Sequence, residues 1–253
     1  MQFAELNNQK VKPIKGQMGY CPMCGAEMIA RCGKVKIHHW AHKGKLHCDK
    51  WWESETQWHR DWKNHFPSEW HEIVHFDING EKHIADVKSK DGLVVEFQHS
   101  PIKPEEKQSR ENFYKSMIWI VDGTRRKRDK ERFFSCSSGF LTTKVRNTYL
   151  VKDPQSAFPN EWINSKSIVF FDFGIHENGT HTLYMLYKTP KAQYYQCTII
   201  DKASIVKIIA NGSLLGLMNE SAIKKQQPNP NPSPNKTNQW ILHKGKLIKR
   251  RRW

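Results

Sequence analysis

Residues 70–123 carry the pattern that most constrains the fold. Three strands are predicted for WHEIVHFD, KHIADVK and LVVEFQ, separated by the turn signals Asn79-Gly80 and Asp91-Gly92. A helical stretch, PEEKQSRENFYKSM, follows, and IWIVDG is typical of a fourth strand. Residues 51–66, WWESETQWHRDWKNHF, predict a helix before the first strand. The order helix, three antiparallel strands, helix, strand predicts a compact α/β (α+β) core over residues 51–123.

Three further regions flank this core. Residues 1–50 are rich in Cys, His, Gly and Lys from residue 17 onward and predict a small module held together by more than its own apolar residues. Residues 124–225 begin with a basic helix, RRKRDKERFF, and continue as a β-rich region containing SIVFFDF, HTLYMLY and QYYQCTII. Residues 226–253 predict an extended Pro/Asn linker and a basic tail, WILHKGKLIKRRRW.

Composition narrows the function classes. The chain has 253 residues and 38% hydrophobic side chains, which excludes a disordered protein. Its 41 Lys+Arg against 25 Asp+Glu give a formal charge of +16, a field that attracts polyanions such as nucleic acid. No stretch approaches the roughly 20 apolar residues that span a bilayer, so we expect a cytoplasmic protein without a membrane partner.

Two acidic residues of the first predicted helix differ in their expected direction. Glu55 falls on the same apolar stripe as Trp51, Trp58 and Trp62, whereas Glu53 falls on the polar side. A carboxylate that faces a core is costly unless it meets a cation or hydrogen-bond donors. We therefore expect Glu55 to be the inward acid.

The hairpin of the second and third strands brings further acids together. Glu96 and Gln98 share one face of their strand, and Asp86 and Lys88 share a face of the preceding one. A two-residue Asp-Gly turn would point Asp86 away from Glu96. A three-residue turn over residues 90–92 would place the two acids opposite each other, with Gly92 in the left-handed conformation, and we predict this second arrangement.

Three converging carboxylates repel one another, and a divalent cation removes that repulsion. Glu55, Asp86 and Glu96 thus form a candidate site for Mg²⁺ or Mn²⁺, ions that can contact a phosphate and activate water. Lys88 is the candidate catalytic cation, and His59 could orient Glu55, relay a proton or contact a phosphate. The alternative is that Asp86 and Glu96 are solvated on the open face of the sheet.

The N-terminal module contains a second candidate metal site. Cys21 and Cys24 form a Cys-x-x-Cys pair, and His39 and His42 form a His-x-x-His pair. Together they predict a structural Cys2His2 zinc site, in which Cys48 could replace one of the histidines. The alternative is a reduced cluster without metal.

Two basic segments are candidate DNA contacts, because cations there would meet phosphates. They are the start of the basic helix and the end of the tail: Arg125, Arg126, Arg128, Lys249, Arg250, Arg251 and Arg252.

In this order, Cys-x-x-Cys, His39-Trp40-Ala41-His42, WWESETQWHRDWK, KHIADVKSKDGLVVEFQHSPI and MIWIVDG make residues 20–123 resemble the competence protein CoiA-like nuclease family. The resemblance implies a PD-(D/E)XK, restriction-endonuclease-like core with a zinc-ribbon-like N-terminal segment and metal-dependent cleavage of DNA. It also implies that Asp86 and Glu96 bind the metal. Gln98 then stands where the superfamily more often has Lys, so Lys88 or His59 would have to supply the missing contribution.

With this resemblance, the sequence predicts a metal-dependent endonuclease or nickase with catalytic residues Glu55, Asp86, Glu96, Gln98, Lys88 and His59. Its expected substrate is foreign or incoming DNA, double- or single-stranded, in transformation or anti-phage defence, with a regulatory protein as a further expected partner. One alternative is a non-catalytic, zinc-containing DNA-binding protein on a nuclease scaffold. The other is a nuclease directed at RNA.

Overall fold

The computed structural model describes residues 1–44, 48–188, 192–214, 240–243 and 246–249. Within these ranges the chain forms a small N-terminal sheet, a long nine-stranded sheet and a two-stranded hairpin. The predicted mixed α+β fold is confirmed. None of the helices in the described ranges combines the length and apolar character needed to cross a membrane.

The N-terminal sheet has the strand order β2-β1-β3-β4-β5. Its strands are β1 (Ala4–Leu6), β2 (Gln9–Val11), β3 (Met18–Tyr20), β4 (Glu27–Arg31) and β5 (His39–His42). Its buried apolar cluster is small and consists of Ala4, Cys21, Met23, Met28 and Trp40. Such a core leaves room for an additional stabilising element, as the sequence indicates.

The central part of the long sheet follows the predicted order. Strands β6 (His71–Phe76), β7 (Lys82–Lys88) and β8 (Val94–Gln98) are antiparallel neighbours. Helix α2 (Pro104–Tyr114) then carries the chain back to β9 (Met117–Asp122), which pairs parallel to β8. Period-two alternation and turn residues were sufficient to locate these elements.

The first helix is shorter than predicted, because α1 spans only Gln57–Lys63. Thr56 is its N-cap and forms a capping box with His59, so the helix begins after Thr56 rather than at residue 51. Trp51 is not helical and stacks on the His83 ring. The expectation that Glu55 lies on a helical stripe is therefore wrong, since Glu55 precedes the helix.

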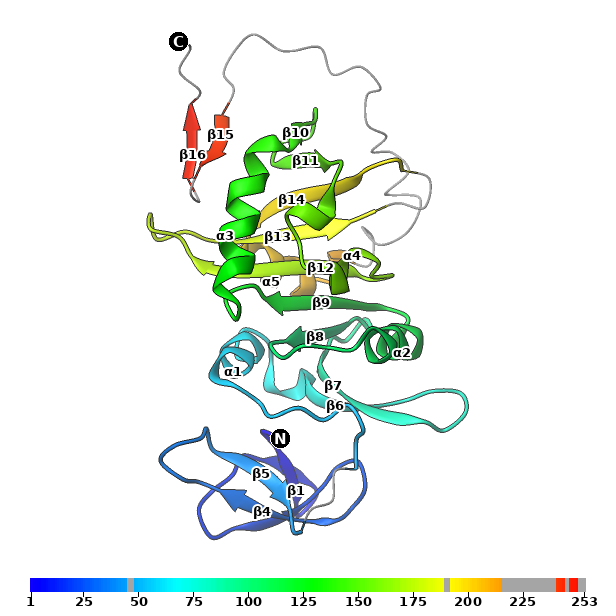
Figure 1. The fold of residues 1–253 in the computed structure, drawn as a ribbon. Helices are drawn as coiled ribbons and strands as arrows, with labels where there is room; N and C mark the ends of the chain where they lie inside the picture. Colours follow the sequence, from blue (N-terminus) through cyan, green and yellow to red (C-terminus); the bar gives the residue numbers. More distant parts are fainter. Residues whose placement is uncertain (45–47, 189–191, 215–239, 244–245, 250–253) are drawn as a thin grey trace.

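The C-terminal region extends the same sheet. Its strands are β10 (Leu141–Thr142), β11 (Thr148–Val151), β12 (Ile168–Ile175), β13 (His181–Tyr187) and β14 (Tyr195–Asp201), giving the order β10-β11-β14-β13-β12-β9-β8-β7-β6. Strand β12 pairs parallel to β9. The boundary expected at residue 123 thus lies between two strands of one continuous sheet (Figure 1).

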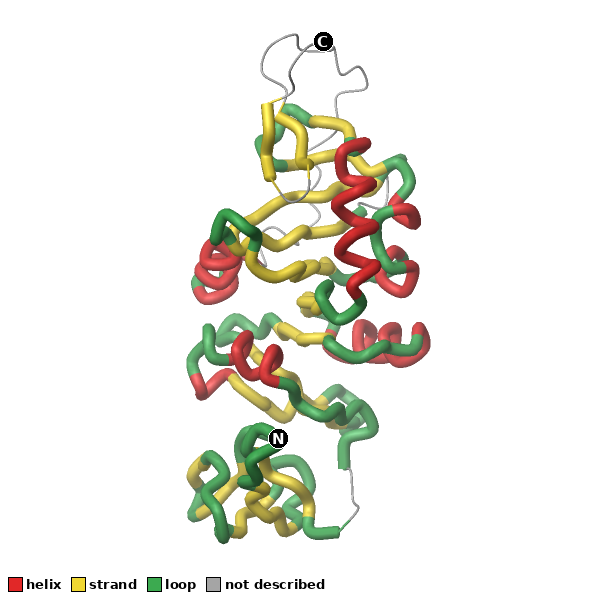
Figure 2. The backbone as a smooth tube through the Cα atoms, turned by 60° about the vertical axis from the view of Figure 1, so that its left-hand side comes forward, coloured by secondary structure: helices red, strands yellow, loops and turns green. Residues whose placement is uncertain are grey.

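Helices cover both sides of this sheet (Figure 2). They are α3 (Lys127–Cys136), α4 (Asn160–Ile163) and α5 (Lys202–Ala210), together with α1 and α2 and the short 3-10 turns Ser68–Trp70, Ser137–Gly139 and Pro154–Ser156. Strands β15 (Trp240–His243) and β16 (Lys246–Lys249) form the separate hairpin. The predicted Pro/Asn linker, residues 226–238, lies outside the described residues.

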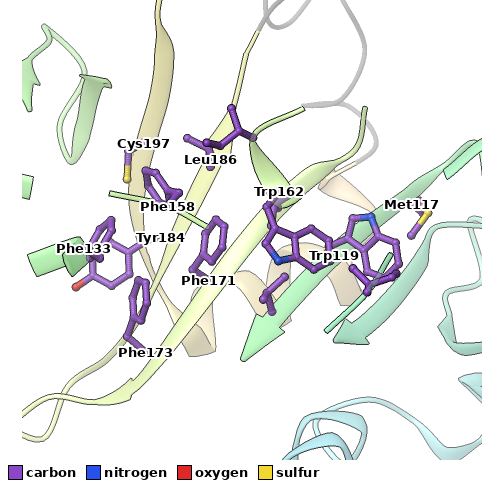
Figure 3. Close-up of a cluster of buried hydrophobic side chains, with 14 of the residues drawn as sticks. Met117, Trp119, Phe133, Phe158, Trp162, Phe171, Phe173, Tyr184, Leu186 and Cys197 are labelled. Atoms are coloured by element: carbon purple, nitrogen blue, oxygen red, sulfur yellow. The ribbon is translucent and has the colours of Figure 1, made fainter. Parts of the chain in front are cut away.

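Two apolar clusters lie on opposite faces of the long sheet. Phe171 and Phe173 of β12 belong to one cluster with Phe133 and Trp119 (Figure 3), whereas Phe170 belongs to the other with Trp62 of α1. Adjacent residues of a strand point to opposite faces, so β12 contributes to both clusters. Helix α1 is therefore packed on the face that carries Phe170.

Candidate functional site

The hairpin of β7 and β8 has the predicted register. Val87 pairs with Val95 and Lys88 with Val94, and Ser89 N donates to Leu93 O at 2.9 Å. A three-residue turn over residues 90–92 remains, with φ of 90° at Gly92. This register places Asp86 opposite Glu96, as the sequence predicted.

The ladder between the two strands ends at these acids. Asp86 N donates to Glu96 Oε1 at 3.2 Å, and Phe97 N donates to Asp86 Oδ2 at 3.0 Å. Each carboxylate thus accepts a hydrogen bond from the backbone of the opposite strand, in place of the usual backbone bond. The strands separate here, and the two carboxylates occupy the fork.

The environment of Glu96 disfavours the charged form of its carboxyl group. Its side chain is 4% exposed, and burial, together with the charge of Asp86, raises the pKa of Glu96 to about 8. Arg110 of α2 opposes this rise, since its Nη1 lies 3.0 Å from Glu96 Oε2. The charged form of Glu96 is therefore disfavoured, and a further cation beside it would stabilise that form.

A second cation, Lys63 of α1, lies on the other side of the fork. Its Nζ is 2.6 Å from Glu55 Oε1, 3.2 Å from Glu72 Oε1 and 3.8 Å from Asp86 Oδ1. Burial favours a lower pKa for Lys63, but the three carboxylates outweigh it and raise the pKa above its ordinary value. Glu55 also pairs with Arg60, so its carboxylate is held by two cations.

Glu72 joins this network to the N-terminal sheet. Its carboxylate accepts from the backbone N–H groups of Gln2 at 2.7 Å and Phe3 at 3.0 Å. Burial acts to raise the pKa of Glu72, but Lys63 and these donors hold it well below its usual range. A single buried carboxylate therefore contacts both the site and the N-terminal sheet.

These groups line one cavity. Its acidic lining is formed by Asp49, Glu53, Glu55, Glu72, Asp86 and Glu96, and its other polar lining includes His59, Lys63, Arg110 and Tyr114. The structure therefore brings the three predicted acids to the same cavity. Glu55, however, contacts Lys63 rather than the Asp86–Glu96 pair.

Lys63, Glu72 and Arg110 were not identified from the sequence. Lys63 follows Glu55 and His59 at intervals of four, a spacing that favours one helical face and could have indicated it. Arg110 lies on the buried side of α2. Glu72 has no comparable signal, because its partners Gln2 and Phe3 are about 70 residues away in the chain.

Gln98 is buried and forms a hydrogen bond with Glu53, a residue that was expected to face solvent. Its Nε2 donates to Glu53 Oε1 at 2.6 Å and to Ser100 O at 3.0 Å. The expectation for Glu53 is therefore wrong, because the helix on which it was based begins only at Gln57. Glu53 instead lines the cavity.

The two residues predicted to compensate for Gln98 differ in position. His59 lines the cavity, and its Nδ1 is 2.8 Å from Thr56 Oγ1 at the start of α1. Lys88 is not among the cavity-lining residues, and its Nζ is 2.8 Å from His75 Nδ1. Lys63 is thus the lysine closest to Asp86 among the ion pairs of the described residues.

The donor set at the fork fits a hard divalent cation. Asp86 and Glu96 provide two adjacent carboxylates, and Mg²⁺ commonly binds one or two protein carboxylates and completes its shell with water. Two buried oxygens nearby, Glu53 Oε2 and Gln98 Oε1, have no hydrogen-bond partner in the described structure. These atoms could accept hydrogen bonds from such waters. Glu55 does not complete a three-carboxylate cluster, because Lys63 lies between it and Asp86.

The N-terminal sheet contains a four-residue cluster of soft ligands. The ligand atoms of Cys21, Cys24, His42 and Cys48 all lie within 4.8 Å of one another. Burial raises the pKa of the Cys21 thiol, and burial with the neighbouring thiols raises that of Cys48. A bound cation would remove this penalty, since it stabilises thiolates.

His39 was predicted as a ligand, but it is not part of this cluster. His39 and His42 lie on strand β5 rather than in a turn, so side chains three residues apart point to opposite faces. His39 Nδ1 instead lies 2.8 Å from Ile37 O. Cys48 takes the fourth position, the substitution that the sequence left open.

The candidate DNA contacts fall in different environments. Arg125, Arg126 and Arg128 are all exposed, but Arg126 also pairs with Asp129 at 2.7 Å and Glu161 at 2.6 Å. In the tail, Lys249 ends β16, and residues 250–252 lie outside the described residues.

Comparison with known proteins identifies the family. The model "Competence protein CoiA, N-terminal domain" matches residues 3–50, and "Competence protein CoiA, nuclease-like domain" matches residues 71–155. The chain belongs to the CoiA-like family. The first match contains all four residues of the Cys/His cluster, and the second contains both Asp86 and Glu96.

The chain is similar in sequence to one curated member of the CoiA-like family. Competence protein CoiA of Bacillus subtilis (strain 168) is 28% identical over 149 residues, which cover 54% of this chain and 40% of the relative. The matched segment thus spans less than half the length of that protein. No solved structure matches the chain.

Proposed function

We propose that this CoiA-like protein is a DNA nuclease that hydrolyses phosphodiester bonds with a divalent cation, Mg²⁺ or Mn²⁺, held by Asp86 and Glu96. The observation that carries the proposal is the fork between β7 and β8, where the buried carboxylate of Glu96 lies beside the partly exposed carboxylate of Asp86. Proteins rarely place unpaired acids together unless a cation or a shared proton resolves the repulsion. The nuclease-like family match supports the same conclusion.

The neighbouring residues support this chemistry. When bound, the cation would polarise the phosphate, activate water and neutralise charge on the leaving oxygen. Arg110 holds Glu96 Oε2 at 3.0 Å and so fixes the direction of that carboxylate. The free Oε1 of Gln98 can accept a hydrogen bond from water. A cationic group at position 98 is absent, and Lys63 is the cation nearest Asp86 among the ion pairs of the described residues.

We also propose zinc at Cys21, Cys24, His42 and Cys48. Three thiolates and one imidazole within 4.8 Å match the ligand set of closed, structural zinc sites, which stabilise small modules without catalysing a reaction. The small apolar core of the N-terminal sheet supports this role.

The proposed substrate is incoming or foreign DNA. The relative's name, competence protein, supports a place in DNA uptake, and the same chemistry would serve anti-phage defence. The charge of +16 and the exposed Arg125 and Arg128 support contact with the phosphate backbone. A regulatory protein partner and a cytoplasmic site of action are part of the same proposal.

A second candidate function is DNA binding without cleavage. It is favoured by one observation: Lys63 and Arg110 already neutralise part of the acidic cluster without a metal. In that case the fork is a buried salt-bridge network, and the zinc module and basic surface carry the activity.

Cleavage assays with matched variants separate the two candidates. Purified full-length protein is incubated with supercoiled plasmid, linear duplex and single-stranded DNA, with Mg²⁺, Mn²⁺ or EDTA. We expect metal-dependent cleavage that Asp86→Asn and Glu96→Gln abolish while DNA affinity persists, and Glu105→Gln, on the exposed start of α2, serves as the control. Absence of cleavage with either metal, or equal cleavage by Asp86→Asn, would favour the binding protein. An RNA substrate tested in parallel addresses RNA-directed cleavage.

A further inference from the structure

The pair Lys63–Glu72 lies outside every residue set predicted from the sequence, although it contacts the site directly. Lys63 is 2% exposed at its side chain, and Glu72 is 6% exposed. Nζ of Lys63 lies between Glu72 and the metal-site acid Asp86, at 3.2 and 3.8 Å from their nearest oxygens. A cation in this position weakens the attraction of Asp86 for a divalent ion, unless an additional negative charge balances it.

Glu72 supplies that negative charge from an unusual backbone position. Its φ is 48°, in the left-handed region that non-glycine residues rarely adopt. Such a conformation persists only where surrounding contacts hold it, and here the N–H groups of Gln2 and Phe3 bind both carboxylate oxygens. The N-terminal sheet therefore fixes the charge that balances Lys63.

A second contact joins the same two parts of the chain. Asp49, next to the cluster ligand Cys48, accepts from Ile84 N at 2.9 Å and lies 2.7 Å from His83 Nδ1. Ile84 is two residues before Asp86 on β7. The N-terminal module thus contacts β7 close to the metal-site acid and contacts Lys63 through Glu72.

We propose that Lys63 and Glu72 are positioning residues that set the affinity of the Asp86–Glu96 site for its divalent ion, with Glu72 held in place by the N-terminal sheet. The inference rests on the proposed nuclease function. Lys63 competes with the metal for the charge of Asp86, and Glu72 limits that competition by pairing with Lys63. Neither residue needs to touch the substrate.

Because Lys63 and Glu72 carry opposite charges, their removal should change Mn²⁺ affinity in opposite directions. Loss of the Glu72 charge leaves Lys63 to pair with Asp86 and Glu55, so Mn²⁺ binding weakens. When the positive charge of Lys63 and the negative charge of Glu72 are removed together, the net charge beside Asp86 is unchanged. Mn²⁺ affinity should then return toward the wild-type value. A purely structural role predicts instead that the double variant binds no better than the single one.

The test measures Mn²⁺ binding to the full chain by calorimetry, with zinc kept at the Cys/His cluster and folding checked by circular dichroism. We expect Glu72→Gln to weaken Mn²⁺ affinity about tenfold or more, the range seen when groups around metal ligands are changed. Lys63→Met/Glu72→Gln should return to within about threefold of wild type. Glu69→Gln, an exposed change three residues away, should match wild type.

The outcomes separate the inference from the function on which it rests. A wild-type protein that binds no Mn²⁺ at the fork overturns both. Wild-type binding with equal weakening in the single and double variants, or with no effect of Glu72→Gln, overturns the inference alone. If Glu72→Gln does not fold, Lys63→Met decides the question: tighter binding than wild type supports the inference, and unchanged or weaker binding overturns it.

Discussion

Asp172 connects the C-terminal strands to helix α1, which carries Lys63, and its removal should destabilise the whole chain. The carboxylate is 3% exposed and accepts from the indole N–H groups of Trp62 at 2.8 Å and Trp58 at 3.2 Å through Oδ2. Through Oδ1 it accepts from Gly174 N at 2.9 Å and lies 2.7 Å from His181 Nε2. Burial acts to raise the pKa of Asp172, but these donors hold it below its usual value.

Asp172→Asn retains the shape of the side chain, but its amide has one oxygen that can accept hydrogen bonds where the carboxylate has two. At least two of the four donors then lose their acceptor. A hydrogen bond to a charged group contributes about 1.5–3 kcal/mol, and breaking a buried charged pair costs about 3–5 kcal/mol. We therefore expect a loss of about 3–5 kcal/mol, which lowers Tm by roughly 6–20 °C for a chain of this size.

Thermal unfolding followed by circular dichroism and tryptophan fluorescence measures this effect. Asp153→Asn, the same change at an exposed position, should alter stability by less than about 0.5 kcal/mol. A Tm for Asp172→Asn equal to that of the Asp153→Asn control would refute the assignment of Asp172 as the anchor of α1.

Three further predictions address the metals and DNA. Burial and the Asp86 charge raise the pKa of Glu96 to about 8. At pH values between the ordinary carboxyl range and that value, the metal-free folded protein therefore binds one more proton than the unfolded chain. Its stability should therefore fall as pH rises through this window, and Mn²⁺ binding should tighten with proton release; an affinity independent of pH between about 6.5 and about 8.5 would contradict this. His42→Ala should lower the zinc content measured by mass spectrometry, whereas His39→Ala should retain it, and the reverse pattern would exclude the assigned ligands. Arg128→Ala should reduce the slope of log DNA affinity against log salt concentration by the equivalent of about one phosphate contact. An unchanged slope would show that this arginine does not contact DNA.

The sequence predicted those parts of the fold that depend on neighbouring residues. Alternation located β7 and β8, and Gly92 marked the three-residue turn that places Asp86 opposite Glu96. Periodicity alone overestimated the first helix, because the apolar residue Trp51 extends the pattern although it packs on His83. The capping box at Thr56 was the local signal that defined the true start.

The remainder of the site depends on contacts between residues that are distant in the chain. Glu72 is close to Lys63 in sequence, but its role follows from the N–H groups of Gln2 and Phe3. Arg110 meets Glu96 only because α2 returns over the sheet. The sequence included His39 in the Cys/His cluster for a related reason: a His-x-x-His pair converges in a helical turn and diverges on a strand, so β5 had to be known first.

These contacts imply that the nuclease-like core is not an independent unit. Helix α1 is held by Asp172 from β12 through both Trp58 and Trp62, and its Lys63 is balanced by Glu72, whose carboxylate accepts from the backbone of Gln2 and Phe3. A change in either flanking region would thus alter the spacing and charge of the fork without touching Asp86 or Glu96. In the proposed nuclease, whose charge of +16 would attract DNA, such an arrangement would make the metal site depend on both flanking regions as well as on DNA contact.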